Sequence, residues 1–199
     1  MVALSGALMP GPLLTVTISE SPRRGYWTGP LLILGHGVLE LTLVAALFLG
    51  LAPLLRTRTM LIISALAGAA VLAWLAGGMI KGLPRLTLQP AATADTRRNL
   101  FAAGIVFSIA NPYWIVWWVT IGLGYVTQSL QFGIWGVLFF FSGHILADLF
   151  WYSAVSTTVW KGRRLMSDRL YRGMIAGCAA LLLLFAGMFA WSGLSRWLT

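Results

Sequence analysis

The chain has 199 residues, of which 59% are hydrophobic and 10% are charged, and its formal net charge is +9. So few charged side chains cannot cover the surface of a soluble protein of this length, and the composition therefore predicts an integral membrane protein. The net charge would suit a nucleic-acid-binding protein, but the basic residues cluster between apolar segments, which excludes that class.

Apolar segments follow one another along the whole chain. They predict six transmembrane helices, over approximately residues 2–19, 26–55, 60–80, 99–126, 131–159 and 171–194. Six spans of about 20 residues account for about 120 residues and leave short loops between them. The expected fold is therefore all-α, in a single membrane domain over residues 1–199.

Lysine and arginine are distributed unevenly over the predicted loops. The first, third and fifth loops with their helix ends carry two, four and five of them, which makes eleven, whereas the opposite side carries three. Because cytoplasmic loops are enriched in Lys and Arg, these three loops are expected in the cytoplasm and both termini outside, with the protein in the cytoplasmic membrane. The third loop, a linker over about 83–98, divides the chain nearly in half.

Two short motifs share a polar signature inside otherwise apolar segments. Residues 35–40 read GHGVLE and residues 143–148 read GHILAD, and together they contain both histidines and two of the five carboxylates of the chain. The two predicted helices that carry them cross the membrane in opposite directions. This pattern predicts an inverted repeat of three plus three helices, with repeat 1 at about 1–82 and repeat 2 at about 99–199.

Proline interrupts the first predicted helix of each half. Pro10, Gly11 and Pro12 break the first helix, and Asn111 and Pro112 break the fourth. Proline removes a backbone donor and clashes with the preceding turn, so neighbouring carbonyl groups lose their partners. In hydrocarbon such groups must face protein or a water-filled cavity, and matched breaks in two halves indicate the binding site of a transporter. A plain proline kink is the alternative interpretation.

Each Gly-His motif places a histidine and a carboxylate on one helix face. His36 and Glu40 are four residues apart, and so are His144 and Asp148. An ionised group near the middle of a membrane costs at least about 2.5–3.5 kcal/mol and usually marks a pathway or a proton relay, and histidine titrates near neutral pH. We therefore predict a centre for substrate binding and proton coupling. The alternative is local: each His–acid pair neutralises its own helix and has a purely structural role.

Aromatic residues follow the break in the fourth helix. Trp114, Trp117 and Trp118 share a helix face and lie deeper than an interfacial aromatic belt. Their rings are candidates for cation–π contact with an organic ammonium group, and packing against lipid is the alternative.

Four stretches occur in order over nearly the whole chain: PGPLLTVTISESPRRG, GHGVLE, LAWLAGGMIKG and SIANPYWIVWWVTIG. With them the sequence resembles the LysE/RhtB family of amino-acid exporters. The resemblance implies a small membrane protein that exports amino acids or related metabolites, driven by protons or by the membrane potential. The resemblance also implies functional roles for seven residues: Pro10, Gly11, Pro12, Glu40, Asn111, Pro112 and Asp148. The two histidines and the aromatic cluster depart from the better-known lysine and homoserine exporters.

The leading hypothesis is a secondary transporter that exports a small amino acid or a related cationic or zwitterionic metabolite. The alternative is a divalent metal exporter with His36, Glu40, His144 and Asp148 as ligands, because imidazole and carboxylate groups bind such ions and the wider superfamily also handles metals. Motifs of zinc proteases, serine hydrolases and phosphate-binding loops do not occur, so neither an enzyme nor a cofactor is expected. The expected partners are a small-molecule substrate and membrane lipid, and a homodimer is compatible with a compact six-helix unit.

Overall fold

The computed structural model describes residues 6–9, 11–50, 57–87 and 99–198. The regular secondary structure of these residues is entirely helical, without strands, so the predicted all-α fold class is confirmed. Four segments are long and apolar enough to cross a membrane: Thr28–Phe48, Arg58–Arg85, Pro112–Gly162 and Asp168–Leu198.

The helices follow the predicted order, with shifted ends. They are α2 (Pro12–Arg24), α3 (Thr28–Phe48), α5 (Arg58–Gly82), α6 (Leu100–Ile109), α7 (Pro112–Trp117), α8 (Leu123–Ser129), α9 (Gly133–Gly162) and α10 (Asp168–Leu198). Short turns extend or join them: η1 (Leu83–Arg85), the π-helix η2 (Trp118–Gly122) and η3 (Leu130–Phe132). α2 ends at residue 24, beyond the predicted boundary at residue 19, so Arg23 and Arg24 belong to its last turn and not to a loop.

Side-chain caps and one glycine decide where several helices begin or end. The side chains of Thr57, Asn99 and Asn111 accept hydrogen bonds from backbone N–H groups in the first turns of α5, α6 and α7. These N–H groups have no partner within their own helix, which is why such caps stabilise helix starts. Gly25 follows the last residue of α2 and caps the helix, with a φ of 78° that is accessible mainly to glycine.

The segment predicted as one helix over residues 99–126 is divided in the structure. α6 ends at Ile109, Asn111 has an extended backbone with φ −91° and ψ 104°, and α7 starts at Pro112. A residue before proline is pushed out of the helical region, which accounts for the end of α6. With 10 residues α6 is about 15 Å long, too short to cross a hydrocarbon core of roughly 30 Å by itself.

The break predicted in the first helix involves Pro10, which lies outside the described residues. The paired breaks and the inverted repeat of three plus three helices therefore stay predictions.

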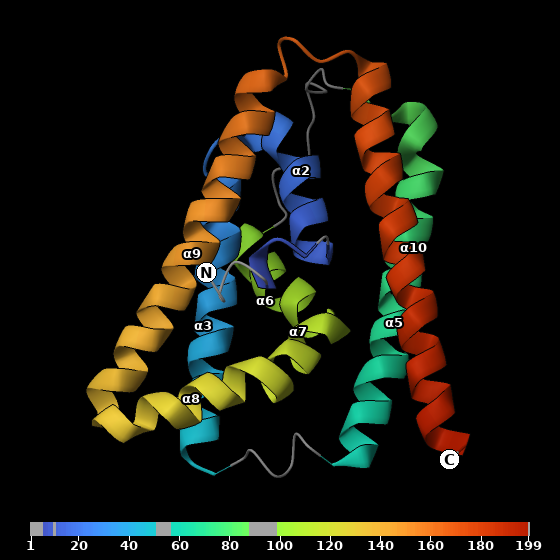
Figure 1. Cartoon of the computed structure of the whole chain (residues 1–199). Helices are drawn as coiled ribbons and strands as arrows, with labels where there is room; N and C mark the ends of the chain where they lie inside the picture. Colours follow the sequence, from blue (N-terminus) through green and yellow to red (C-terminus); the bar gives the residue numbers. More distant parts are fainter. Residues whose placement is uncertain (1–5, 10, 51–56, 88–98, 199) are drawn as a thin grey trace.

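The helices form two groups (Figure 1). α2, α3, α6 and α9 pack on one another and are called the four-helix body below, whereas α5 and α10 form an antiparallel pair that packs chiefly on itself. Leu32 and Phe107 belong to the core of the body, and Leu72 and Leu182 to the core of the α5–α10 pair. The segment α7–η2–α8–η3 runs obliquely across one end of the molecule and joins α6 to α9.

Glycine allows α3 and α6 to approach closely. A Cβ atom on Gly35 would overlap the carbonyl oxygen of Phe101, and one on Gly104 would overlap the carbonyl oxygen of Leu32. The two helices thus cross with their backbones in contact, a packing typical of small residues in membrane proteins. This crossing brings His36 on α3 beside Ser108 on α6.

Candidate functional site

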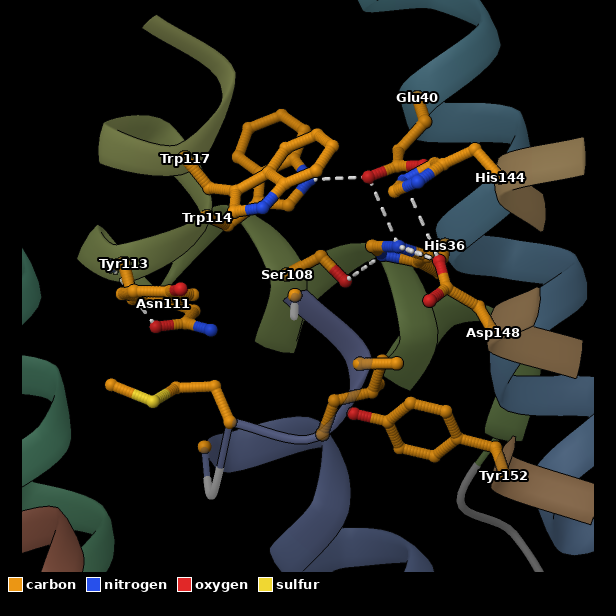
Figure 2. Close-up of a pocket in the computed structure, with 15 residues that line it drawn as sticks. His36, Glu40, Ser108, Asn111, Tyr113, Trp114, Trp117, His144, Asp148 and Tyr152 are labelled. Atoms are coloured by element: carbon orange, nitrogen blue, oxygen red, sulfur yellow. Dashed lines mark hydrogen bonds and ion pairs between the residues drawn. The ribbon is translucent and has the colours of Figure 1, made fainter. Parts of the chain in front are cut away.

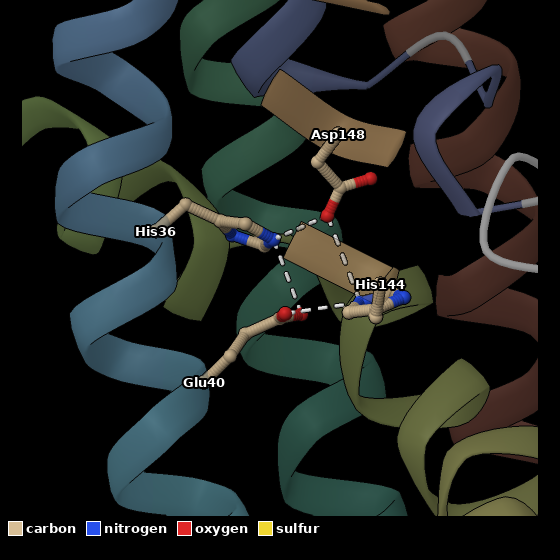
Figure 3. Close-up of side chains that lie close together, drawn as sticks. All are labelled: His36, Glu40, His144 and Asp148. Atoms are coloured by element: carbon tan, nitrogen blue, oxygen red, sulfur yellow. Dashed lines mark ion pairs between the residues drawn. The ribbon is translucent and has the colours of Figure 1, made fainter. Parts of the chain in front are cut away.

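The two Gly-His motifs meet inside the four-helix body. His36 and Glu40 project from α3, His144 and Asp148 project from α9, and the four side chains converge (Figure 3). All four residues are buried, with exposed fractions between 1% and 7%. The four-residue spacing places both members of each pair on the helix face that is turned toward the other helix. These four residues are called the ionisable cluster below.

Each histidine of the cluster contacts carboxylates from both helices. His36 Nε2 lies 3.1 Å from Glu40 Oε1 and 3.4 Å from Asp148 Oδ2. His144 Nε2 lies 3.0 Å from Glu40 Oε2 and 3.6 Å from Asp148 Oδ2. The contacts are therefore not confined to the pair within each helix, and the shortest contact of His144 crosses from α9 to α3.

Two indole groups bind Glu40 from the opposite side. Trp114 Nε1 donates a hydrogen bond to Glu40 Oε1 at 2.9 Å, and Trp118 Nε1 donates to the same oxygen at 2.8 Å. An indole N–H can only donate, and its hydrogen bonds to an ionised group are stronger than neutral ones. Trp117 stacks on His144, with ring centroids 4.9 Å apart and ring planes inclined by 22°. Trp117 and Trp118 are thus buried against the ionisable cluster and are not packed against lipid.

Ser108 connects the ionisable cluster to α6. His36 Nδ1 lies 2.7 Å from Ser108 Oγ, and this hydroxyl lies 2.6 Å from the carbonyl oxygen of Gly104. A carbonyl oxygen can only accept, so the hydroxyl proton of Ser108 goes to Gly104 and His36 Nδ1 donates to Oγ. The hydrogen-bond network therefore assigns a proton to Nδ1 of His36 and directs its Nε2 toward the two carboxylates.

The ionisable cluster forms one wall of a pocket (Figure 2). The cavity volume accessible to water is about 50 Å³. A few water molecules, or part of a small solute, fit into this space. Apolar, aromatic and polar groups complete the wall, among them Ala7, Met9, Gly11, Leu13, Ser108, Asn111, Tyr113, Trp114, Trp117 and Tyr152.

Most of the predicted site residues come together at this pocket. Gly11, Asn111 and Trp114 line it together with the four residues of the ionisable cluster. Pro12 and Pro112 do not line it: Pro12 lies next to it in a smaller cavity, and Pro112 packs against Gly68 of α5. Pro10 lies outside the described residues.

Sequence patterns did not single out Ser108 and Tyr152, which also line the pocket. Ser108 precedes Asn111 by three positions, and Tyr152 follows Asp148 by four. Helical spacing from a predicted residue is therefore the signal that indicates them. It is a weak signal, because every helical residue has neighbours at these spacings.

Comparison with known proteins bears on the function of this arrangement. Residues 4–193 match the sequence pattern of the family described as LysE type translocator. The chain belongs to this family. Since the family consists of transporters, this LysE family member is a multi-pass membrane transporter and not an enzyme.

Three relatives of this LysE family member match over most of their length. It is 36% identical over 184 residues to the chemotactic transduction protein ChpE of Pseudomonas aeruginosa, with 85% of this chain and 86% of ChpE covered. It is 28% identical to an uncharacterized membrane protein of the same organism, with 94% of this chain and 91% of the relative covered. It is 22% identical to the Bacillus subtilis protein named "Putative amino acid efflux protein YcgF", with 98% and 95% covered. No solved structure matches the chain.

Proposed function

We propose that this LysE family member exports a small amino acid, or a related cationic or zwitterionic metabolite, across the cytoplasmic membrane. The observation that carries the proposal is the buried ionisable cluster, which opens on a pocket lined by aromatic and polar side chains. Ionisable groups inside a membrane protein are costly and usually mark the path of a substrate or of protons. The name of the Bacillus subtilis relative, which refers to amino acid efflux, supports the same class of cargo.

The ionisable cluster also offers a way to couple export to protons or to the membrane potential. Two imidazole Nε2 atoms share two carboxylates, so a change in the protonation of one group alters the contacts of the others. Histidine is the side chain that most readily changes its charge near physiological pH. A cationic cargo and a proton would compete for the same carboxylate oxygens, which is the physical requirement for their exchange.

The proposal includes the arrangement of the chain in the membrane. We expect repeat 1 (1–82) and repeat 2 (99–199) to be related as inverted repeats, and α3 and α9 support this by presenting matching His and acid faces to each other. The distribution of Lys and Arg favours a cytoplasmic linker at 83–98 and both termini outside. A site between two such repeats can open to either side when they rock against each other.

Membrane lipid is the expected environment of the outer apolar side chains. Trp74, Phe139 and Trp191 have exposed fractions of 75%, 75% and 76%, as lipid-facing residues would. Formation of a homodimer stays a prediction.

A divalent metal ion is the second candidate cargo. Each residue of the ionisable cluster offers one nitrogen or oxygen atom as a ligand, and these four atoms lie within 4.8 Å of one another. Imidazole and carboxylate groups bind divalent metal ions. Against this candidate, Glu40 Oε1 already accepts two indole hydrogen bonds. These hydrogen bonds compete with metal binding at that oxygen.

Transport into proteoliposomes with an imposed pH gradient tests the proposal. The purified full chain is offered a pool of labelled amino acids and, in separate assays, Mn²⁺, Co²⁺ and Ni²⁺. We expect gradient-dependent accumulation of at least one amino acid, and its loss in Glu40→Gln and in Asp148→Asn. Asp168→Asn is the matched control, because it changes a carboxylate at the start of α10, outside the pocket.

Two results would contradict the proposal in different ways. Accumulation of a metal ion without any amino acid would favour the second candidate cargo. Unchanged amino-acid transport in both Glu40→Gln and Asp148→Asn would show that the ionisable cluster is not the transport site.

A further inference from the structure

The two carboxylates of the ionisable cluster are held very differently, and Glu40 is the enclosed one. Its Oε1 accepts the indole hydrogen bonds of Trp114 and Trp118 at 2.9 Å and 2.8 Å, and lies 3.1 Å from His36 Nε2. Its Oε2 lies 3.0 Å from His144 Nε2, and the side chain is only 2% exposed. Donor groups therefore surround Oε1, while Oε2 is fully buried against His144 at ion-pair distance without forming a hydrogen bond. A cargo would have to displace a protein group to reach Glu40.

Asp148 has longer contacts and one oxygen without a partner. Its Oδ2 lies 3.4 Å from His36 Nε2 and 3.6 Å from His144 Nε2. Among the residues that the structure describes, none forms a hydrogen bond or ion pair with its Oδ1. Asp148 lines the pocket, and Figure 2 shows its second oxygen turned toward the interior. Asp148 is thus the carboxylate that a cargo in the pocket can reach.

Tyr152, one turn further along α9, presents a second unused oxygen to the same pocket. The residue is only 5% exposed and belongs to the core of the four-helix body. Its hydroxyl nevertheless has no hydrogen-bond partner within the described part of the chain, and it points into the pocket (Figure 2). This oxygen faces the pocket and is free to accept, so a cargo group that donates a hydrogen bond would gain affinity here.

The charge of the pocket favours a cation at this place. The ionisable cluster pairs two carboxyl groups with two imidazoles, so as long as both carboxyl groups are ionised it carries no net positive charge in any protonation state of the imidazoles. No Lys or Arg is found among the described residues that line the pocket. A primary ammonium group carries one positive charge and up to three N–H donors, which matches an open carboxylate oxygen beside an open hydroxyl.

We infer that Asp148 Oδ1 and the Tyr152 hydroxyl bind the primary ammonium group of the cargo, whereas Glu40 is a positioning residue that holds the two imidazoles. The inference rests on the proposed transport function and extends it, because it assigns one chemical end of the cargo to two groups of α9. It also separates the roles of two carboxylates that look equivalent in the sequence.

Binding of simple probes to the purified full chain tests this inference independently of transport. n-Butylammonium carries the ammonium group, butyrate carries a carboxylate on a similar chain, and tetramethylammonium carries the positive charge without N–H donors. Affinities are measured by titration of the intrinsic tryptophan fluorescence, since Trp114 and Trp117 line the pocket. We expect the wild-type chain to bind n-butylammonium in preference to butyrate.

The two substitutions should affect the probes differently. Tyr152→Phe should weaken n-butylammonium binding about fivefold, as expected for one lost hydrogen bond, and leave tetramethylammonium binding unchanged. Asp148→Asn should weaken the binding of both cations about tenfold or more, because it removes the charge. Tyr125→Phe and Asp168→Asn are matched controls outside the pocket, and should bind all probes as the wild type does.

Tyr152→Phe decides the test even if Asp148→Asn fails to fold, because it keeps the buried ring and removes only the hydroxyl. Equal n-butylammonium affinity in Tyr152→Phe and the wild type, or no binding of this probe by the wild type, would overturn the inference. If amino-acid transport persists alongside such a result, the proposed function stands and only the ammonium site is wrong. If the probes behave as expected but no amino acid is transported, the ammonium site stands and the cargo class must be revised.

Discussion

The four-helix body and the α5–α10 pair are both apolar, yet they are packed in different ways. In the body, a Cβ atom on Gly35 would overlap the backbone of Phe101, and one on Gly29 would overlap the backbone of Tyr152. In the α5–α10 pair, the contact is made by side chains such as Leu182, and a Cβ atom on Gly193 would overlap the side chain of Leu66 and not a main chain. The body depends on close contact between main chains, whereas the pair depends on ordinary side-chain packing.

This difference explains why the ionisable cluster lies in the four-helix body. Close crossings fix α3 against α6 and against α9, so His36, Ser108 and Asp148 are held at hydrogen-bonding or ion-pair distances. The α5–α10 pair supplies none of the four ionisable residues and contacts the other described helices at few places: α10 touches α2, and Gly68 of α5 meets Pro112 of α7. A movement of the α5–α10 pair relative to the four-helix body would therefore disrupt less packing than a movement of the helices within the body.

The largest expected effect comes from Gly35→Leu, which should break the four-helix body. Even a single Cβ atom at this position overlaps the carbonyl oxygen of Phe101, so α3 and α6 would have to separate. The cost should exceed the roughly 1–3 kcal/mol typical of overpacked cores. We expect no monodisperse folded protein in size-exclusion chromatography. Gly173→Leu on α10 is the matched control and should elute as the wild type, and wild-type elution of Gly35→Leu would contradict the close crossing.

An intermediate effect is expected from Leu182→Ala, which probes the α5–α10 pair. Leu182 is 1% exposed and packs in the same core as Leu72. Shortening a buried leucine typically costs about 2–5 kcal/mol, so the midpoint of thermal unfolding should fall although the protein still folds. Leu184→Ala, on the same helix but 58% exposed, should change the free energy of unfolding by less than about 0.5 kcal/mol. Equal effects of both substitutions would show that this core does not hold the pair together.

The smallest effect on stability is expected from Ser108→Ala, which leaves the backbone crossing intact. The substitution removes the acceptor of His36 Nδ1, and an unsatisfied buried donor costs about 1–3 kcal/mol. Transport should slow more clearly than stability falls, because Nε2 of His36 is then less firmly directed toward the carboxylates. Ser64→Ala on α5 is the control, since the Ser64 hydroxyl bonds to its own helix at Leu61. Wild-type transport by Ser108→Ala would rule out this positioning role.

Helical spacing predicted the residues of the ionisable cluster but not all of their partners. His36 with Glu40, and His144 with Asp148, are visible in the sequence because residues four positions apart share a helix face. Their contacts across α3 and α9, and the part played by Ser108, depend on the rotation of each helix about its axis. Spacing within one helix carries no information on that rotation relative to a neighbour. The division of the predicted fourth helix at Asn111 and Pro112 follows from local chemistry, since proline acts on the residue directly before it.

The sequence by itself determined the membrane class, the order of the helices and the residues that carry charge in the apolar interior. Hydrophobicity and helical spacing are local properties, so they can be read from one stretch at a time. Only the tertiary structure decided that indole groups enclose Glu40, whereas Asp148 keeps an oxygen open to the pocket beside Tyr152. That difference arises from the way α7, η2 and α9 are placed around α3. Helix packing depends on many side chains from separate elements at once, and no single stretch of sequence contains them.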